Sequence, residues 1–153
     1  MNAFDITLFD FTVSIQPARR AWNQAAGTVV ASSGVSMSVG VTVILAFRLG
    51  EDALQATIAQ EAGVNPAAMV RTLDQAEEAG LLRRHEAPGN RRGKVIRLLP
   101  KGEKLAHQLE AALATLRREL LSDIPAHEIE TGMRVLRTLE ARSLAYMQDE
   151  RQK

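Results

Sequence analysis

The chain has 153 residues, a net charge of +1 and no cysteine. This length predicts one domain, residues 1–153, with room for a hydrophobic core. The lack of cysteine excludes disulfides and thiolate metal sites and agrees with a reducing compartment, so we expect a cytoplasmic protein. The first ten residues contain two Asp and no Lys or Arg, unlike a signal peptide. The longest apolar run, Val35–Leu49, has about 15 residues, fewer than the roughly 20 that span a bilayer, so no membrane partner is expected.

Apolar residues recur every three or four positions from Phe4 to Val29, which predicts a helical stripe. Pro17 interrupts the stripe, because a proline inside a helix removes one backbone hydrogen bond. The pattern allows one long kinked helix, or a short helix followed by another that begins at Pro17. We favour a helix over residues 17–32 with a looser helical lead-in. The next segment, Ser36–Leu49, is rich in β-branched residues, but its length and its Ser start favour a buried helix.

A helix, a tight turn and a second helix are predicted next. Residues 54–62 form the first helix, which ends at Gly63 because glycine tolerates the left-handed conformation found there. Asn65 can cap and Pro66 can open the second helix, which stops at Gly80. The predicted buried face of this second helix consists of Met69, Val70, Leu73, Ala76 and the aliphatic stem of Glu77. Its predicted outward face consists of Ala67, Ala68, Arg71, Thr72 and Gln75.

Positive charge is concentrated after this second helix. Residues 81–104 contain eight Lys or Arg and two Glu, a local net charge of +6 in a chain of +1, which indicates one surface that faces a polyanion. Within this segment, residues 81–86 and 94–99 predict a β-hairpin with Pro88-Gly89-Asn90 as its turn. The register stays open, because apolar residues occur there in adjacent pairs. The basic residues expected on a solvated strand face rather than on DNA are Arg83, Arg84 and Arg97.

The last third of the chain predicts two helices, separated by Asp123-Ile124-Pro125. A leucine stripe runs from Leu105 to Leu120, and a second apolar stripe runs from Ile129 to Met147. Apolar stripes on these helices and on the N-terminal segment predict a partner surface. The simplest partner is a second copy of the chain, so we expect a homodimer.

Between Leu54 and Gly102 the chain resembles the winged helix-turn-helix of the MarR family of bacterial transcriptional regulators. The segment Arg71-Thr72-Leu73-Asp74, with Gly80 nine residues after its first residue, resembles the end of that family's recognition helix. Arg92, Leu98 and Gly102 fall on the family's wing signature, which is Asp-x-Arg followed by Leu-Thr-x-x-Gly.

The resemblance implies a mostly α fold, in which residues 36–102 form the winged helix-turn-helix part and residues 1–35 and 103–153 form a helical dimerisation part. It also implies a regulator, with a ligand-responsive repressor favoured, that binds a pseudo-palindromic operator in double-stranded DNA as a homodimer. Two signature positions differ, since the Asp falls on Asn90 and the Thr on Leu99. Asn cannot form an ion pair, and Leu lacks a hydroxyl that could cap the following helix.

A recognition helix offers its N-terminal residues to base edges in the major groove, and its first amides favour a phosphate. Arg71 can pair with guanine through two hydrogen bonds, whereas the alanines of the same face can only touch a thymine methyl. A face with so few donors predicts a larger share of affinity from phosphates and groove shape. On the wing, the resemblance implies Arg92 in the minor groove and Arg91 and Lys94 on the phosphate backbone. The candidate DNA-binding residues are Asn65, Ala67, Ala68, Arg71, Thr72, Gln75, Asn90, Arg91, Arg92 and Lys94.

Trp22 is a candidate for lining a small-molecule effector pocket between the dimerisation helices and the winged helix, where the resemblance implies effector binding, although a buried aromatic residue is more often core. The three histidines have no Cys or paired His at ligand spacing, and the chain has no Gly-rich phosphate loop or nucleophile motif. We therefore expect no metal, no cofactor and no enzymatic activity. The competing class is a dimeric protein-interaction module with weak or no DNA binding.

Overall fold

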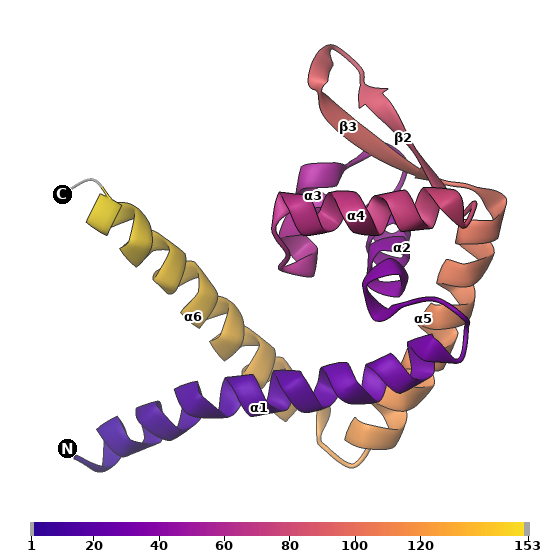
Figure 1. The fold of residues 1–153 in the computed structure, drawn as a ribbon. Helices are drawn as coiled ribbons and strands as arrows, with labels where there is room; N and C mark the ends of the chain where they lie inside the picture. The colour runs from indigo at the N-terminus through magenta and orange to yellow at the C-terminus, as the bar shows by residue number, and fades with distance from the viewer. Residues whose placement is uncertain (1, 152–153) are drawn as a thin grey trace. The chain divides into compact units, whose positions relative to one another are not determined.

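The protein is described by a computed structural model that covers residues 2–151, apart from the side chains of Asn90, Arg91 and Arg92. Its contacts divide the chain into two compact units, Met1–Leu116 and Arg117–Lys153. As predicted, the fold is mostly α with a small sheet (Figure 1). The described elements are α1 (Ala3–Ala31), α2 (Met37–Leu49), β1 (Ala53–Leu54), α3 (Gln55–Ala62), α4 (Pro66–Glu78), β2 (Leu82–Ala87), β3 (Asn90–Leu98), α5 (Pro100–Leu121) and α6 (Ala126–Arg151).

Helix α1 continues through Pro17, so the expectation of a separate helix beginning at residue 17 is wrong. Its start carries a capping box, in which the Asn2 side chain accepts the Asp5 backbone N–H at 2.9 Å. The Asp5 carboxylate in turn accepts the Asn2 N–H at 3.1 Å. The helix extends on both sides of the proline, which removes one backbone hydrogen bond from a helix of 29 residues.

The predictions for α2, α3 and α4 are confirmed. The Ser36 side chain caps α2, and this helix contributes a mainly apolar set of buried residues, Val39, Gly40, Thr42, Val43, Ile44 and Ala46. Burial therefore outweighs the strand propensity of its β-branched residues. Helix α3 ends at Gly63, which has a φ of 67°, and Asn65 caps α4. The two-residue strand β1 was not predicted, because so short a strand exists only through its pairing with β3.

The sheet has the antiparallel order β1-β3-β2, and β2 pairs with β3 in a register that places Leu82 opposite Leu98 and Arg84 opposite Ile96. Strand β3 begins at Asn90, four residues before the predicted start, and a bulge lies between Glu86 and Ala87. We call β2, β3 and their turn, residues 82–98, the wing. Figure 1 shows the paired strands of the wing extending beyond α4.

The core of the first unit combines side chains from α1 to α5 and from the base of the wing. The following side chains are at most 1 % exposed: Val30, Val43, Ile58, Leu73, Leu82, Ile96 and Leu109. The prediction that α4 buries Val70 is wrong, since this side chain is 39 % exposed. The buried stripe of α4 steps from Met69 to Leu73 and Ala76, and Val70 is rotated about 100° away from Met69 on the helix.

The two predicted C-terminal helices are confirmed as α5 and α6. Helix α5 buries Leu105, Leu109 and Leu113, so much of its leucine stripe belongs to the core. Helix α6 buries none of its described residues and carries exposed apolar side chains, among them Leu136 and Tyr146. Among residues 2–151, no helix is both long enough and apolar enough to cross a membrane.

Gly102 lies where α5 approaches the backbone that precedes β2. A Cβ atom at this position would lie 2.0 Å from the carbonyl oxygen of Leu81, closer than any real contact. We expect Gly102→Ala to destabilise the fold by about 1–3 kcal/mol, because backbone rather than a flexible side chain must move. Gly132→Ala in α6 is the matched control, since its Cβ would meet nothing within 4 Å. That control should stabilise its exposed helix by about 0.5–1 kcal/mol. Denaturant unfolding measures both changes, and equal effects would contradict the close approach.

Candidate nucleic-acid interface

The helix that follows the tight turn, α4, begins at a capped and exposed N-terminus. The Asn65 side chain accepts the backbone N–H of Ala68 at 2.8 Å, and Pro66 occupies the first helical position. Proline lacks an N–H, so it leaves one fewer donor to satisfy at this end. The helix dipole and the remaining free amides give the start of α4 a partial positive charge, which favours an anion such as a phosphate.

The outward face of α4 consists of a row of exposed side chains flanked by half-buried ones. Ala67, Arg71 and Gln75 are exposed and four residues apart, so they lie in one row along the helix. Ala68 and Thr72 are half-buried, and the Thr72 hydroxyl donates to the Ala68 carbonyl at 3.1 Å. Within the part of the chain that the structure describes, the Arg71 guanidinium has no hydrogen-bond or ion-pair partner, so its donors are available to a ligand.

The wing contributes Lys94, whose side chain is 48 % exposed. Its Nζ lies 4.0 Å from the carboxylate of Glu86, which stands opposite it in the register of β2 and β3. An exposed pair at this distance contributes little and leaves the ammonium group available to a phosphate. The predicted contacts Asn90, Arg91 and Arg92 lie in β3, but their side chains are outside the described part of the structure.

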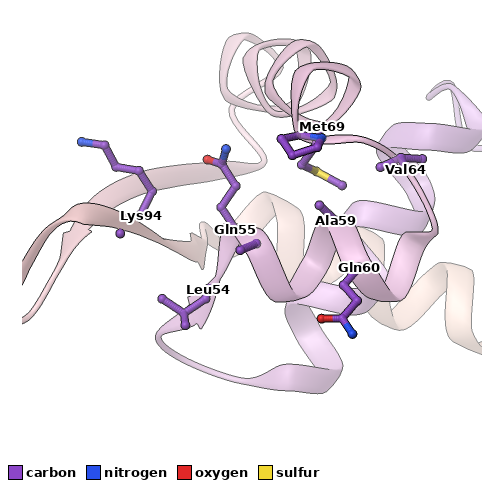
Figure 2. Close-up of a pocket in the computed structure, with 10 residues that line it drawn as sticks. Leu54, Gln55, Ala59, Gln60, Val64, Met69 and Lys94 are labelled. Atoms are coloured by element: carbon purple, nitrogen blue, oxygen red, sulfur yellow. The ribbon is translucent and has the colours of Figure 1, made fainter. Parts of the chain in front are cut away.

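A cleft of about 560 Å³ separates the wing from the two helices of the turn (Figure 2). Its lining comes from β1, α3, the start of α4 and β3, with the residues Leu54, Gln55, Ala56, Ala59, Gln60, Val64, Pro66, Met69, Gly93 and Lys94. Figure 2 shows Met69 and Ala59 among the helices, and Lys94 beyond Gln55 on the wing. The cleft therefore places Lys94 across from the start of α4, so the two predicted contact regions border one depression.

At the other end of α4, the wing is attached by an ion-pair network. The Arg84 guanidinium of β2 donates to Glu77 Oε2, from Nε at 3.0 Å and from Nη2 at 2.5 Å, and Nη2 also contacts Asp74 Oδ1 at 2.5 Å. The prediction that Arg84 lies on a solvated strand face is wrong, because its side chain is only 23 % exposed and turns toward α4. Asp74 and Glu77 are three residues apart on a helix, which places both carboxylates on one face.

Two further basic residues of the same charged segment have partners within the protein. Arg97 in β3 pairs with Asp52 at 2.8 Å, and both side chains are about half exposed. Lys101 at the start of α5 donates from Nζ to the carbonyl of Ala79 at 2.7 Å, so it satisfies a carbonyl at the C-terminus of α4.

The comparison with known families matches this region. The sequence model of the MarR family matches residues 33–93. This range runs from the residues just before α2 through α3 and α4 into the wing. Over these residues the chain matches the MarR family. The MarR-family structures that this chain resembles are described as transcriptional regulators.

Three solved structures illustrate the likeness. The transcriptional regulator PA3341 is 28% identical, over 88% of this chain and 98% of that one, with a TM-score of 0.81. CouR from Rhodococcus jostii RHA1, bound to p-coumaroyl-CoA, is 22% identical over 85% of this chain and 91% of that one, with a TM-score of 0.77. A MarR mutant from E. coli, complexed with operator DNA, is 17% identical over 91% of this chain and 99% of that one, with a TM-score of 0.72. The last two show the shared fold.

The MarR signature positions have clear structural roles where the structure describes them. Leu98 is half-buried and packs against the core, and Gly102 permits the close approach of α5. Leu99, where the signature has Thr, joins strand and helix through its backbone, since its N–H donates to Leu81 at 2.9 Å and its carbonyl accepts the Glu103 N–H at 3.0 Å. Trp22 lies in α1, half-buried and packed against the core.

The Arg84 network makes a pH-dependent contribution to stability. The hydrogen bond from Arg84 lowers the pKa of Glu77 in the folded state. At a pH above about 4.3, the pKa of a glutamate in the unfolded chain, this lowered pKa contributes its full stabilisation. The stabilisation is lost as the pH falls through the pKa of Glu77 in the folded state. We expect wild type to exceed Glu77→Gln in unfolding free energy from pH 5.5 to 7, with the difference shrinking below about pH 4. Glu78→Gln, at an exposed neighbour, should show no such change. Urea unfolding across this range is the test, and a difference that does not vary with pH would contradict it.

Proposed function

We propose that this chain is a sequence-specific DNA-binding regulator of the MarR family that acts in the cytoplasm as a homodimer, and that it represses transcription by occupying a pseudo-palindromic operator. The observation that carries this proposal is the exposed face of α4, where a capped N-terminus is followed by an Arg71 guanidinium without a partner among the described residues. The operator complex of the E. coli MarR mutant, which shares the fold, supports the same reading.

In this proposal α4 lies in the major groove with its N-terminus toward the DNA. The helix start, capped by Asn65, receives a phosphate, and Arg71 makes a bidentate pair with a guanine. Gln75 extends the same row as a hydrogen-bonding side chain, whereas Ala67 and Ala68 contact a thymine methyl. The Thr72 hydroxyl already donates within the helix, so it offers the DNA an acceptor.

The wing supplies contacts that carry less sequence information. By the family resemblance Arg92 enters the minor groove, while Arg91 and Lys94 bind phosphates beside Asn90. Because α4 offers few donors to bases, phosphate contacts and groove shape carry much of the affinity. Lys94 is the member of this group whose exposed side chain the structure describes.

DNA binding is tested by selecting duplexes from a random pool and measuring affinity for the selected site as salt is varied. We expect affinity to fall steeply with salt, because each phosphate contact releases counterions. Arg71→Ala should relax the preference at one base pair by about 1–3 kcal/mol, since it removes a bidentate base contact. Lys94→Ala should weaken all sites equally, and Arg20→Ala, an exposed arginine of α1, should change neither property.

Failure to bind any duplex, or affinity that does not respond to salt, would overturn the regulator proposal and favour a protein-interaction module. Equal, sequence-independent losses from Arg71→Ala and Lys94→Ala would leave DNA binding in place but contradict the roles assigned to the two residues.

The homodimer rests on apolar side chains that each terminal helix exposes. Helix α1 exposes Phe4 at 68 % and Phe9 at 58 %, and α6 exposes Leu136 at 46 % and Tyr146 at 68 %. Large apolar side chains gathered in this way are costly in water and mark association surfaces. A two-fold dimer would also present two α4 helices to a pseudo-palindromic site.

Single charges placed in these surfaces should break the dimer. Phe9→Glu and Leu136→Glu should each weaken association at least about tenfold, because burying one such side chain contributes about 1.5–3 kcal/mol. Gln16→Glu adds the same charge at an exposed polar position of α1 and should leave the dimer intact. Sedimentation velocity at micromolar concentration distinguishes the species, and a monomeric wild type would refute the homodimer.

We further propose that a small molecule releases the operator by preferring a geometry of the dimer that does not bind DNA. Such a ligand lowers DNA affinity only by its differential affinity for the two geometries. Trp22, half-buried in α1, is the candidate residue for lining its pocket. The structure of CouR bound to p-coumaroyl-CoA, which shares this fold, supports a ligand-responsive regulator.

A further inference from the structure

The contacts between α4 and the wing are distributed unevenly along the helix. Near its C-terminus, Glu77 accepts from the Arg84 side chain and also from the Arg84 backbone N–H, at 2.8 Å. At the very end, the Ala79 carbonyl accepts from Lys101. Toward its N-terminus, the start of α4 faces β3 across the cleft shown in Figure 2. The core holds α4 along its length through Met69, Leu73 and Ala76, but among the described residues the hydrogen bonds between α4 and the wing lie near its C-terminus.

The attachment lies between the two parts that are proposed to read DNA. Ten residues separate Glu77 from Ala67, which is roughly 15 Å along a helix. Five residues separate Arg84 from Gly89 at the wing turn, which is roughly 17 Å along a strand. A rotation of about 10° at the attachment would therefore displace the start of α4 by about 2.6 Å relative to the wing, by the same helix rise. A shift of that size breaks a hydrogen bond to a base edge.

The chemistry of the network suits an attachment of fixed angle. Arg84 uses a planar guanidinium to bridge two carboxylates on one face of α4, so its Nε and Nη2 donors are already engaged. Its side chain is 23 % exposed and that of Glu77 is 30 % exposed, so both are partly shielded from solvent. The lowered pKa of Glu77 agrees with a carboxylate that stays ionised and paired. An arginine held in this way presents fewer donors to a phosphate than an unpaired one.

We propose that Arg84, Glu77 and Asp74 form a positioning clamp that fixes the angle between α4 and the wing, so that both engage one DNA site together. Arg84 is then a positioning residue, although it belongs to the basic segment that faces the polyanion. This inference rests on the proposed DNA binding and adds to it a role for two acidic residues of the recognition helix.

The direction in which one substitution changes DNA affinity distinguishes the clamp from simple electrostatics. Glu77→Gln removes an anion from a surface that binds a polyanion, which by charge alone should strengthen binding. If Glu77 belongs to a clamp, the same substitution should weaken binding, by about five- to twentyfold. Glu78→Gln is the matched control, because it removes the same charge one residue further along α4 at an exposed position. This control should leave affinity unchanged or slightly increased.

Binding is measured on the dimeric full chain with its selected duplex, at a temperature about 20 °C below the melting midpoint of each variant. Under these conditions, substituting a residue that only stabilises the fold leaves DNA affinity unchanged. A loss of affinity in Glu77→Gln therefore reports positioning. Asp74→Asn, which removes the more exposed partner, should show a smaller loss in the same direction and provides the test if Glu77→Gln does not fold.

A double-substitution cycle then asks whether the clamp couples helix and wing. Lys94→Ala should lower DNA affinity in the wild-type background. It should lower affinity less when combined with Arg84→Gln, because a wing whose angle to α4 is no longer fixed already contacts the DNA poorly. Additive losses, or a Glu77→Gln variant that binds as well as Glu78→Gln, would overturn the clamp. A wild type that binds no duplex would instead defeat the proposed function, so the two failures are distinguishable.

Discussion

The fold depends most on the packing of three elements around the peptide backbone of Leu81. Its N–H donates to the carbonyl of Ala76 at 2.9 Å, which ends α4, and its carbonyl accepts the N–H of Leu99 at 2.9 Å, which closes the base of the wing. The same carbonyl lies so close to Gly102 that no side chain fits there. Because α4, the wing and α5 meet at one residue, a displacement of any of them strains the other two.

This junction explains why the functional face lies at the opposite end of α4. The carbonyl end of the helix is occupied by structural contacts, whereas the amide end is capped only by Asn65 and is exposed to solvent. A helix dipole makes the amide end the favourable side for an anion. Arg71 then lies between the two ends, close enough to the start to reach a ligand and without a partner among the described residues.

Features determined by local chemistry could be predicted from the sequence, and features determined by distant contacts could not. Ser36, Gly63 and Asn65 act through bonds to neighbouring residues, so the limits of α2, α3 and α4 followed from residue type. The course of α1 through Pro17 depends on how well the rest of the helix offsets one lost hydrogen bond, which no single residue reveals. Arg84 was placed on a solvated face because its partners lie in another element, although the spacing of the two acidic residues on α4 was a usable signal.

The charged segment from residue 81 to 104 therefore has two separate roles. Its net charge of +6 suggested one polyanion-facing surface, but among the basic residues whose side chains the structure describes, Arg84, Arg97 and Lys101 have hydrogen-bond partners within the protein. Arg84 joins the wing to α4, Arg97 joins β3 to the residue before β1, and Lys101 satisfies the end of α4. Counting charge thus overstates the surface available to DNA, because a guanidinium already paired with carboxylates has lost most of its capacity to replace counterions on a phosphate. The same three residues fix the geometry in which the remaining basic side chains, with Lys94 among them, can bind the backbone together.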